Sequence, residues 1–387
     1  MAYDVSSSFE SQTRSKSPNV ERTFTIAGSD YSDRVIKWPK FKRTWDDIRP
    51  RTIQIKLANG DKGMNFLRTD KTLMEGQCLL NMGVVGETII LFEGKIRATK
   101  YLKEDCNISI VDKFQQLSER KMGSSDVPVN YMSSNYLPSD IAWWAVTSYG
   151  GYSNLTSSNN PDIDYDAFAT WAGVFSGDSV FVEGTFDGQK VTEVLRKISR
   201  HTHSAIFIKE NKISFHRFGL ADANVSSLGP ADIIDMELSF DTSDITNRQY
   251  VSGDFNTSTK AHQFTVLQAS SASVNSFGIK ETTLLDNNLW YVNSASAINL
   301  AQRKILANAE PDDSITVQTG LVGLPRQIGE TMLVEDAFHN ISESYRILDH
   351  QVDMDSGKTL FRIDRTQLTN AFVLDTTSLG STLEVLT

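Results

Sequence analysis

Short runs of alternating apolar and polar residues dominate the first 123 positions. Ile53, Ile55 and Leu57 fall on one side of an extended chain, the period-two pattern of a half-buried strand. The sequence Asn59-Gly60-Asp61 that follows is a strong turn signal. Further strand candidates occupy residues 22–27, 88–101 and 107–111. The pattern predicts a β domain over residues 20–123, with a short helix after Asp112.

Helical periodicity appears in two places. Val191, Val194, Leu195 and Ile198 recur at the spacing of one helix face. Strand candidates flank this helix at 180–185, 205–209 and 212–218, so we expect a helix–hairpin domain over residues 180–235. A second helix is predicted over residues 295–309, among the strand candidates that make up a second β domain at 236–368.

Residues 124–179 have a different composition. Clusters of Ser, Asn, Gly and Pro alternate with Trp143, Trp144 and Tyr149. Linkers lack aromatic residues, so we expect an ordered insertion or an interface segment, with a surface loop at 154–161. The aromatic rings suit either a protein interface, where Trp and Tyr are enriched, or stacking on a sugar.

These patterns together predict a fold class that is mainly β with α+β parts. Two small, tube-like β-barrel domains are joined by the helix–hairpin domain and the aromatic-rich insertion. Strands do not alternate with helices along the chain, which argues against a doubly wound parallel sheet. Residues 1–19 are polar and Ser-rich, so we expect a flexible N-terminal arm, and residues 369–387 form a C-terminal tail. The sequence contains no apolar run long enough to span a bilayer.

Charge is distributed unevenly along the chain. The net charge is −10, but residues 1–123 carry 21 Lys+Arg and 16 Asp+Glu, or +5, and the rest carries 17 and 32, or −15. Such asymmetry indicates different neighbours for the two parts, although ordinary solvating surface charge also explains it. The acidic part should repel nucleic acid, because binding requires cations that neutralise phosphates.

Motifs for catalysis or cofactor binding are absent from the sequence. There is no phosphate-binding glycine loop, no GxSxG nucleophile elbow and no HExxH metal motif. His201 and His203 are better read as structural histidines near a helix end, and Cys78 and Cys106 as reduced thiols. The acidic run that begins at Asp162 lacks the Gly and Glu that a calcium loop requires. We therefore predict no catalytic, cofactor-binding or metal-binding residues, no cofactor and no enzymatic activity.

Residues 31–39, the strand-like stretches 53–59 and 91–96, and residues 112–123 resemble, in this order, the first domain of siphophage tail-tip hub proteins. The unit that begins at Phe186-Asp187-Gly188 resembles their middle, and Trp290 with the helix at 295–309 resembles a later region. The run 371–375, which includes Phe372 and Leu374, is also similar. Phe372 and Leu374 join Trp143, Trp144 and Tyr149 as candidate interface residues.

The resemblance implies a fold like the central hub of contractile-tail baseplates. In that family two tube domains per chain lie side by side, and a homotrimer forms a pseudo-sixfold ring around the DNA exit channel. The implied partners are a distal tail protein, a tape measure protein and a central fibre or tip protein. Phage DNA passes through the lumen without specific binding, and no stable membrane insertion is expected. The chain would be made in the host cytoplasm and located in the virion, at the tail tip or baseplate.

Two other functions remain open from the sequence. A carbohydrate-binding tail adhesin that contacts the host surface is supported only by the aromatic segment around Trp143. A cell-wall hydrolase needs paired carboxylates, which meet only in the folded chain, so spacing in the sequence cannot test it.

Overall fold

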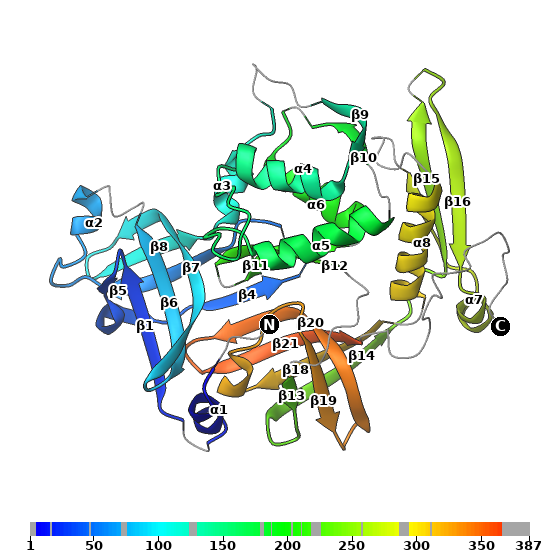
Figure 1. The fold of residues 1–387 in the computed structure, drawn as a ribbon. Coiled ribbons are helices and arrows are strands. Elements are labelled where there is room, and N and C mark those ends of the chain that lie inside the picture. Colours follow the sequence, from blue (N-terminus) through cyan, green and yellow to red (C-terminus); the bar gives the residue numbers. More distant parts are fainter. Residues whose placement is uncertain are drawn as a thin grey trace.

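The computed structural model describes residues 5–365 of the 387-residue chain. It leaves out 16–17, 46–47, 71–75, 124–129, 179–181, 187, 203, 210, 218–225, 257, 286–293 and 310–311. Two curled β-sheets, a helical domain and a smaller three-stranded unit make up the molecule (Figure 1). The predicted class, mainly β with α+β parts, is confirmed.

The first curled sheet, which we call half-barrel A, is built from the N-terminal part of the chain. Its strands are β1 (Val20–Ile26), β2 (Ser29–Asp30), β3 (Val35–Lys37), β5 (Thr52–Ala58), β6 (Gln77–Val84), β7 (Glu87–Tyr101) and β8 (Asp105–Val111). They lie in the order β2-β1-β6-β7-β8-β5-β3. The two outermost strands, β2 and β3, are separated along the chain only by residues 31–34, which include the 3-10 turn η1 (Ser32–Arg34). Five residue steps span at most roughly 18 Å, so the two ends of the sheet must curl toward each other.

The concave side of half-barrel A is an apolar core. The alternation predicted for residues 52–58 is confirmed, because Ile53, Ile55 and Leu57 are buried and the residues between them are exposed. The short helix predicted after Asp112 is also present, as α3 (Phe114–Glu119), and a single turn, α2 (Phe66–Thr69), precedes β6.

The second curled sheet, half-barrel B, comes from the C-terminal part of the chain. Its strands are β13 (Ser226–Leu228), β14 (Ile233–Asp241), β18 (Asp312–Thr319), β19 (Thr331–Asp336), β20 (Ile341–Asp353) and β21 (Lys358–Arg365). They lie in the order β13-β19-β20-β21-β18-β14, and the 3-10 turn η4 (Leu321–Gly323) follows β18. The outermost strands are again separated by four residues, 229–232, so this sheet curls in the same way. It begins ten residues before the predicted boundary at 236.

The two half-barrels have the same topology. Strands β2, β3, β5, β6, β7 and β8 correspond, in chain order and in sheet position, to β13, β14, β18, β19, β20 and β21. Strand directions also agree: β13 is parallel to β19, and β2 is parallel to β6, because β1 is inserted antiparallel to both. The chain therefore contains the same β unit twice, with β1 as an addition to the first copy.

A helical domain lies above the two half-barrels in Figure 1. Its helices are α4 (Pro138–Trp144), which continues as a π-helical turn η3 (Ala145–Tyr149), α5 (Tyr165–Asp178) and α6 (Val191–Thr202). Two pairs of antiparallel strands accompany them: β9 (Asn130–Tyr136) with β10 (Val182–Thr185), which are distant in the chain, and the hairpin of β11 (Ser204–Lys209) and β12 (Lys212–Arg217). The helix–hairpin unit predicted around α6 is confirmed, and α6 buries the predicted positions Val191, Val194, Leu195 and Ile198.

One hydrophobic cluster joins the aromatic insertion to the helix–hairpin unit. It contains Ile141 from the insertion, Trp171 from α5, Leu195 from α6 and Phe215 from β12. Trp171 lies 5.0 Å from Phe215, centroid to centroid, and its indole N–H donates to the Ser204 hydroxyl at 2.9 Å. The cluster therefore combines residues from both sides of the boundary predicted between 179 and 180. Sequence periodicity did not reveal α5, because its aromatic residues lie in a stretch rich in Ser, Asp and Gly.

A three-stranded unit is inserted into half-barrel B between β14 and β18. Its strands are β15 (Arg248–Asn256), β16 (Ala261–Ala269) and β17 (Glu281–Leu285), in the sheet order β16-β15-β17. The short helix α7 (Ser271–Phe277) lies between β16 and β17 in the chain. Helix α8 (Ser294–Asn308), predicted from sequence at 295–309, packs against β15 and β16. The hairpin of β15 and β16 projects beside the helical domain on the right of Figure 1.

The structure differs from the flexible arm that we expect at residues 1–19. Its described part contains helix α1 (Ser7–Thr13), which packs against β6 and buries Phe9 at 1% exposure. The Ser6 hydroxyl caps this helix by accepting from the Phe9 N–H, and Arg14 forms an ion pair with Asp232. A polar composition concealed the helix, since one buried aromatic residue and one cap are enough to anchor it.

Candidate assembly interface

Strand β4 (Lys40–Thr44) links the two half-barrels. The chain leaves half-barrel A at Trp38-Pro39, and β4 then pairs antiparallel with β20 of half-barrel B, with Phe41 opposite Val352. Figure 1 shows β4 crossing from one half-barrel to the other. Half-barrel A thus supplies a strand to the sheet of half-barrel B, which fixes the two units relative to each other.

The β4–β20 joint is electrostatically complementary. The ammonium of Lys40 lies 2.6 Å from the Asp353 carboxylate, and that of Lys42 lies 2.6 Å from the Asp349 carboxylate. Burial alone would raise the pKa of Asp353, but hydrogen bonds from Lys40 and Ser356 outweigh it, so the pKa is lowered. A basic strand from the basic half of the chain therefore lies beside an acidic strand from the acidic half.

Arg43 connects three parts of the molecule at the same joint. It is 7% exposed on β4, and its guanidinium donates to the Leu91 carbonyl of β7 and, at 3.2 Å, to the Gln327 side chain. Opposite it on β20, His350 is fully buried and stacks on Phe361 at 5.0 Å. Burial, with the nearby charge of Arg43, lowers the pKa of His350 to about 3, so the imidazole is neutral near pH 7.

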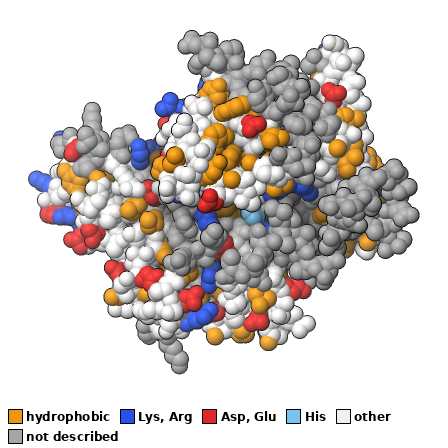
Figure 2. Space-filling view, in the orientation of Figure 1, with side chains coloured by type: hydrophobic (Ala, Val, Ile, Leu, Met, Phe, Trp, Pro, Cys, Tyr) orange, Lys and Arg blue, Asp and Glu red, His pale blue; other side chains and the backbone are white. Residues whose placement is uncertain are grey.

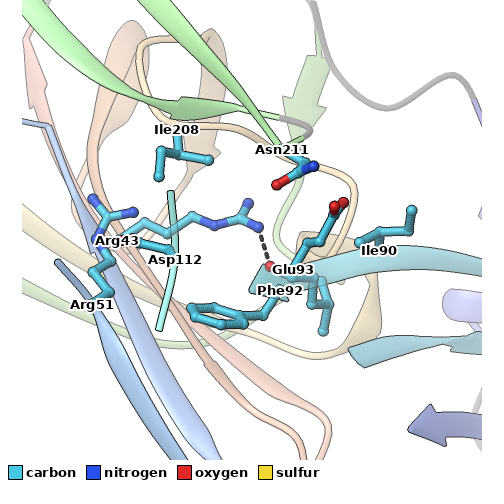
Figure 3. A pocket seen from close by; sticks show the side chains of 9 residues that line it. Arg43, Arg51, Ile90, Phe92, Glu93, Asp112, Ile208 and Asn211 are labelled. Carbon is cyan, nitrogen blue, oxygen red and sulfur yellow. Dashed lines mark hydrogen bonds between the residues drawn. The ribbon is translucent and has the colours of Figure 1, made fainter. Parts of the chain in front are cut away.

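A small polar hollow lies where half-barrel A meets β4 and the β11–β12 hairpin. Figure 3 shows Arg43 and Arg51 with Glu93 and Asn211 around it, and the dashed line marks the bond from Arg43 to the Leu91 carbonyl. Burial raises the pKa of Glu93. The cavity volume of about 20 Å³ is enough for a water molecule and too small for a cofactor. This hollow is therefore part of a domain junction.

The predicted aromatic interface residues lie in helical structure. Trp143 lies in the last turn of α4, and its ring lies 5.0 Å from Phe168 and 5.8 Å from Tyr165. Trp143, Trp144 and Tyr149 are half-buried and pack against the core of the helical domain. Apolar side chains are visible at the surface over this domain in Figure 2. Trp290, Phe372 and Leu374 lie outside the described residues.

Two of the residues that the sequence suggested for metal binding, Asp162 and His201, lie in the described part of the chain. Asp162, the start of the acidic run, accepts from the Lys113 ammonium at 2.9 Å and from the Ser153 N–H at 3.0 Å, which ties down the surface loop. Burial, with the charge of nearby cations, lowers the pKa of His201 to about 3, and His203 is outside the described residues. Within the described part of the chain, no three His, Cys, Asp or Glu side chains are grouped to hold a metal.

The β4–β20 joint was not predicted from sequence, although a signal for it exists. Lys40 and Lys42 lie two residues apart, and Asp349 and Asp353 lie four apart, so each pair falls on one face of an extended strand. Opposite charges that face each other in this way favour pairing between two strands.

Comparison with known proteins identifies the fold. No protein-family model matches the sequence, and neither does any curated protein. A tail protein from Neisseria meningitidis MC58 has a TM-score of 0.59 with 14% identity, over 90% of this chain and 97% of the other. The 43 kDa tail protein of prophage MuSo2 from Shewanella oneidensis has a TM-score of 0.57 with 11% identity, over 90% and 99%. Prophage tail protein gp18 from Listeria monocytogenes has a TM-score of 0.53 with 11% identity, over 90% and 95%.

This chain has the fold of phage tail proteins. The match extends over nearly the full length of all three structures, so it includes both half-barrels and the domains between them. Among the described helices, none combines the length and the apolar character needed to cross a membrane.

Proposed function

We propose that this chain is the structural, non-catalytic hub of a phage tail tip. Three copies form a ring that joins the tail tube to the tip and surrounds the DNA exit channel. The observation that carries this proposal is the duplicated half-barrel: one chain presents the same β unit twice. Three such chains supply six equivalent positions with threefold symmetry, which is what an adapter between a hexameric tube and a trimeric tip requires.

The proposed partners follow from that position. The distal tail protein lies on the tube side, the tape measure protein in the lumen and the central fibre or tip protein below. The excess of acidic residues after residue 123 supports a lumen wall that offers no counter-charge to phosphates, so that DNA slides through it. A ring whose inner wall is dominated by Lys and Arg would contradict this part of the proposal.

Packing of the aromatic segment favours the hub over the adhesin. Trp143 and Trp144 contact this chain's own core, and the Trp143 ring already makes an edge-to-face contact with Tyr165 and a tilted contact with Phe168. A sugar-binding platform needs a free aromatic face. We therefore assign these rings to the stability of the helical domain and to its contact with neighbouring tail proteins.

Labelling of the chain in assembled tails tests the proposal. Gold-labelled antibody should bind at the tip end of the tail, and quantitative mass spectrometry should give three copies per particle. Label along the tail shaft, or on peripheral fibres, would overturn the hub assignment. Clearing of peptidoglycan by the purified chain in a zymogram would overturn its non-catalytic part.

A further inference from the structure

The topological match between the half-barrels shows one strand position that is filled in B and open in A. In half-barrel B, β20 continues past its pairing with β19, which ends at Arg346, and β4 pairs with the continuation from Asp349 to Asp353. The counterpart of β20 is β7, which also continues past its pairing with β6, as far as Tyr101. Within the described residues, no strand pairs with this continuation on the β6 side.

The side of half-barrel B that is available for the open position is indicated by topology. Strand β4 follows β3, the outermost strand of half-barrel A. The counterpart of β3 is β14, the outermost strand of half-barrel B, which in the described structure pairs only with β18. Half-barrel A therefore extends toward B of the same chain through its β3–β4 side. The β14 side of half-barrel B is left to face another half-barrel A.

Charge at these two edges is complementary. From residue 95 to residue 103 the chain carries Lys95, Arg97, Lys100 and Lys103 and no acidic residue. From residue 226 to residue 244 it carries five acidic residues and no Lys or Arg. On β14, the side chains of Asp235 and Glu237 are exposed. This repeats the polarity of the joint within the chain, where Lys40 and Lys42 of β4 lie beside Asp353 and Asp349 of β20.

We propose that β14 of one copy pairs antiparallel with the residue 96–101 segment of β7 in the next copy. The pairing satisfies two open strand edges at once, and it joins different surfaces of the two copies, as a closed ring requires. Every junction around the ring then places a basic edge of half-barrel A beside an acidic edge of half-barrel B. The inference rests on the proposed ring and names the strands that close it.

Disulfide cross-linking tests the pairing directly. Ala98→Cys on β7 is combined in turn with Asp235→Cys, Glu237→Cys and Ser239→Cys, which are three exposed positions that scan the register along β14. The native Cys78 and Cys106 are buried and should not react. One of the three combinations should give at least roughly tenfold more covalent trimer than the others, because a disulfide needs Cβ atoms about 3.5–4.5 Å apart.

A matched control uses Ala98→Cys with Ser258→Cys, an exposed position on the β15–β16 turn. Equal yields of trimer from this control and from the β14 positions would overturn the pairing. A ring seen by microscopy of the wild-type chain, without cross-linking at any β14 position, would overturn the pairing and leave the hub function standing. Absence of the wild-type chain from tail tips would overturn the hub function itself.

Charge reversal gives a second test, which does not depend on exact register. Arg97→Glu with Lys100→Glu should reduce the trimer fraction in native mass spectrometry, and so should Asp235→Lys with Glu237→Lys. All four changes in one chain should restore it, because each interface regains opposite charges. Lys62→Glu with Lys260→Glu has the same net change as the first pair at exposed sites away from both edges, and should leave the trimer fraction unchanged. If each double variant lowers the trimer fraction and the quadruple variant does not restore it, the pairing is contradicted.

Discussion

At the scale of single residues, the joint between the half-barrels depends on buried polar groups. Arg43, Asp349 and His350 are each less than a tenth exposed. Such groups are tolerated only when partners replace the water they lose. Arg43 bonds to the Leu91 carbonyl and Gln327, and Asp349 pairs with Lys42 and Arg362. His350 is the exception, because its ring nitrogens have no hydrogen-bond partner among the described residues, and burial keeps the imidazole neutral. The geometry of the joint is therefore specified by a few side chains.

Arg43→Met should destabilise the chain by roughly 2 kcal/mol, since it leaves the Leu91 carbonyl and the Gln327 amide without their charged donor. Urea unfolding measures the loss. Lys37→Met, at an exposed position on β3, is the control and should change stability little. Equal stability of the Arg43 variant and wild type would show that this contact does not hold the half-barrels together.

His350 should make the fold sensitive to acid. Its folded pKa, about 3, lies below the ordinary value of 6.5, so the unfolded chain binds the proton first as the pH falls. The resulting loss of folding free energy is absent above pH 6.5 and grows by up to about 1.4 kcal/mol per pH unit between pH 6.5 and pH 3. His350→Phe should therefore show a shallower loss of stability than wild type over pH 6.5–4.5. Parallel curves from chemical denaturation would contradict the assignment.

At the scale of elements, sequence patterns predicted strands and helices that bury one clean face. The strand at 52–58 is predicted because its buried residues recur at every second position: Ile53, Ile55 and Leu57. Helix α6 is predicted because its buried residues recur at the spacing of one helix face: Val191, Val194, Leu195 and Ile198. Helix α5 was missed, since its packing depends on Trp171, which contacts Phe175 of the same helix and Phe215 of a hairpin distant in the sequence. The β4–β20 pairing links residues about three hundred positions apart, a contact that local periodicity does not contain.

Helix α1 shows that a polar N-terminal segment can contribute to the fold. Phe9→Ala should destabilise the chain by about 3 kcal/mol, because a fully buried aromatic ring is removed from the core of half-barrel A. Phe338→Ala, at a side chain that is 89% exposed, is the matched control and should change little. Thermal unfolding compares the two. Similar midpoints for both variants would mean that α1 is a passive arm after all.

At the scale of the whole molecule, the duplicated topology and the divided charge point to the same assembly. The joint within the chain already combines a basic edge with an acidic one, and the proposed joint between copies repeats it. The duplication is not visible as a sequence repeat, because β4 interrupts the first copy and the three-stranded unit with α8 interrupts the second. The equivalence became visible only in the order and direction of the strands.

The ring should weaken with salt. Raising the salt from roughly 0.1 M to roughly 1 M shortens the Debye length from about 10 Å to about 3 Å, which screens exposed charge pairs. We expect the trimer fraction in sedimentation velocity to fall over this range, while the secondary structure measured by circular dichroism stays constant. A trimer fraction that is constant or rises with salt would indicate an apolar interface instead.

The central claim is that one chain supplies two equivalent positions of a ring. Electron cryo-microscopy of the tail tip tests it most directly. The account predicts a ring with threefold symmetry, in which six similar half-barrels, alternately A and B, surround an open channel. A ring with one half-barrel per chain at the channel wall, or an assembly with no central opening, would contradict it.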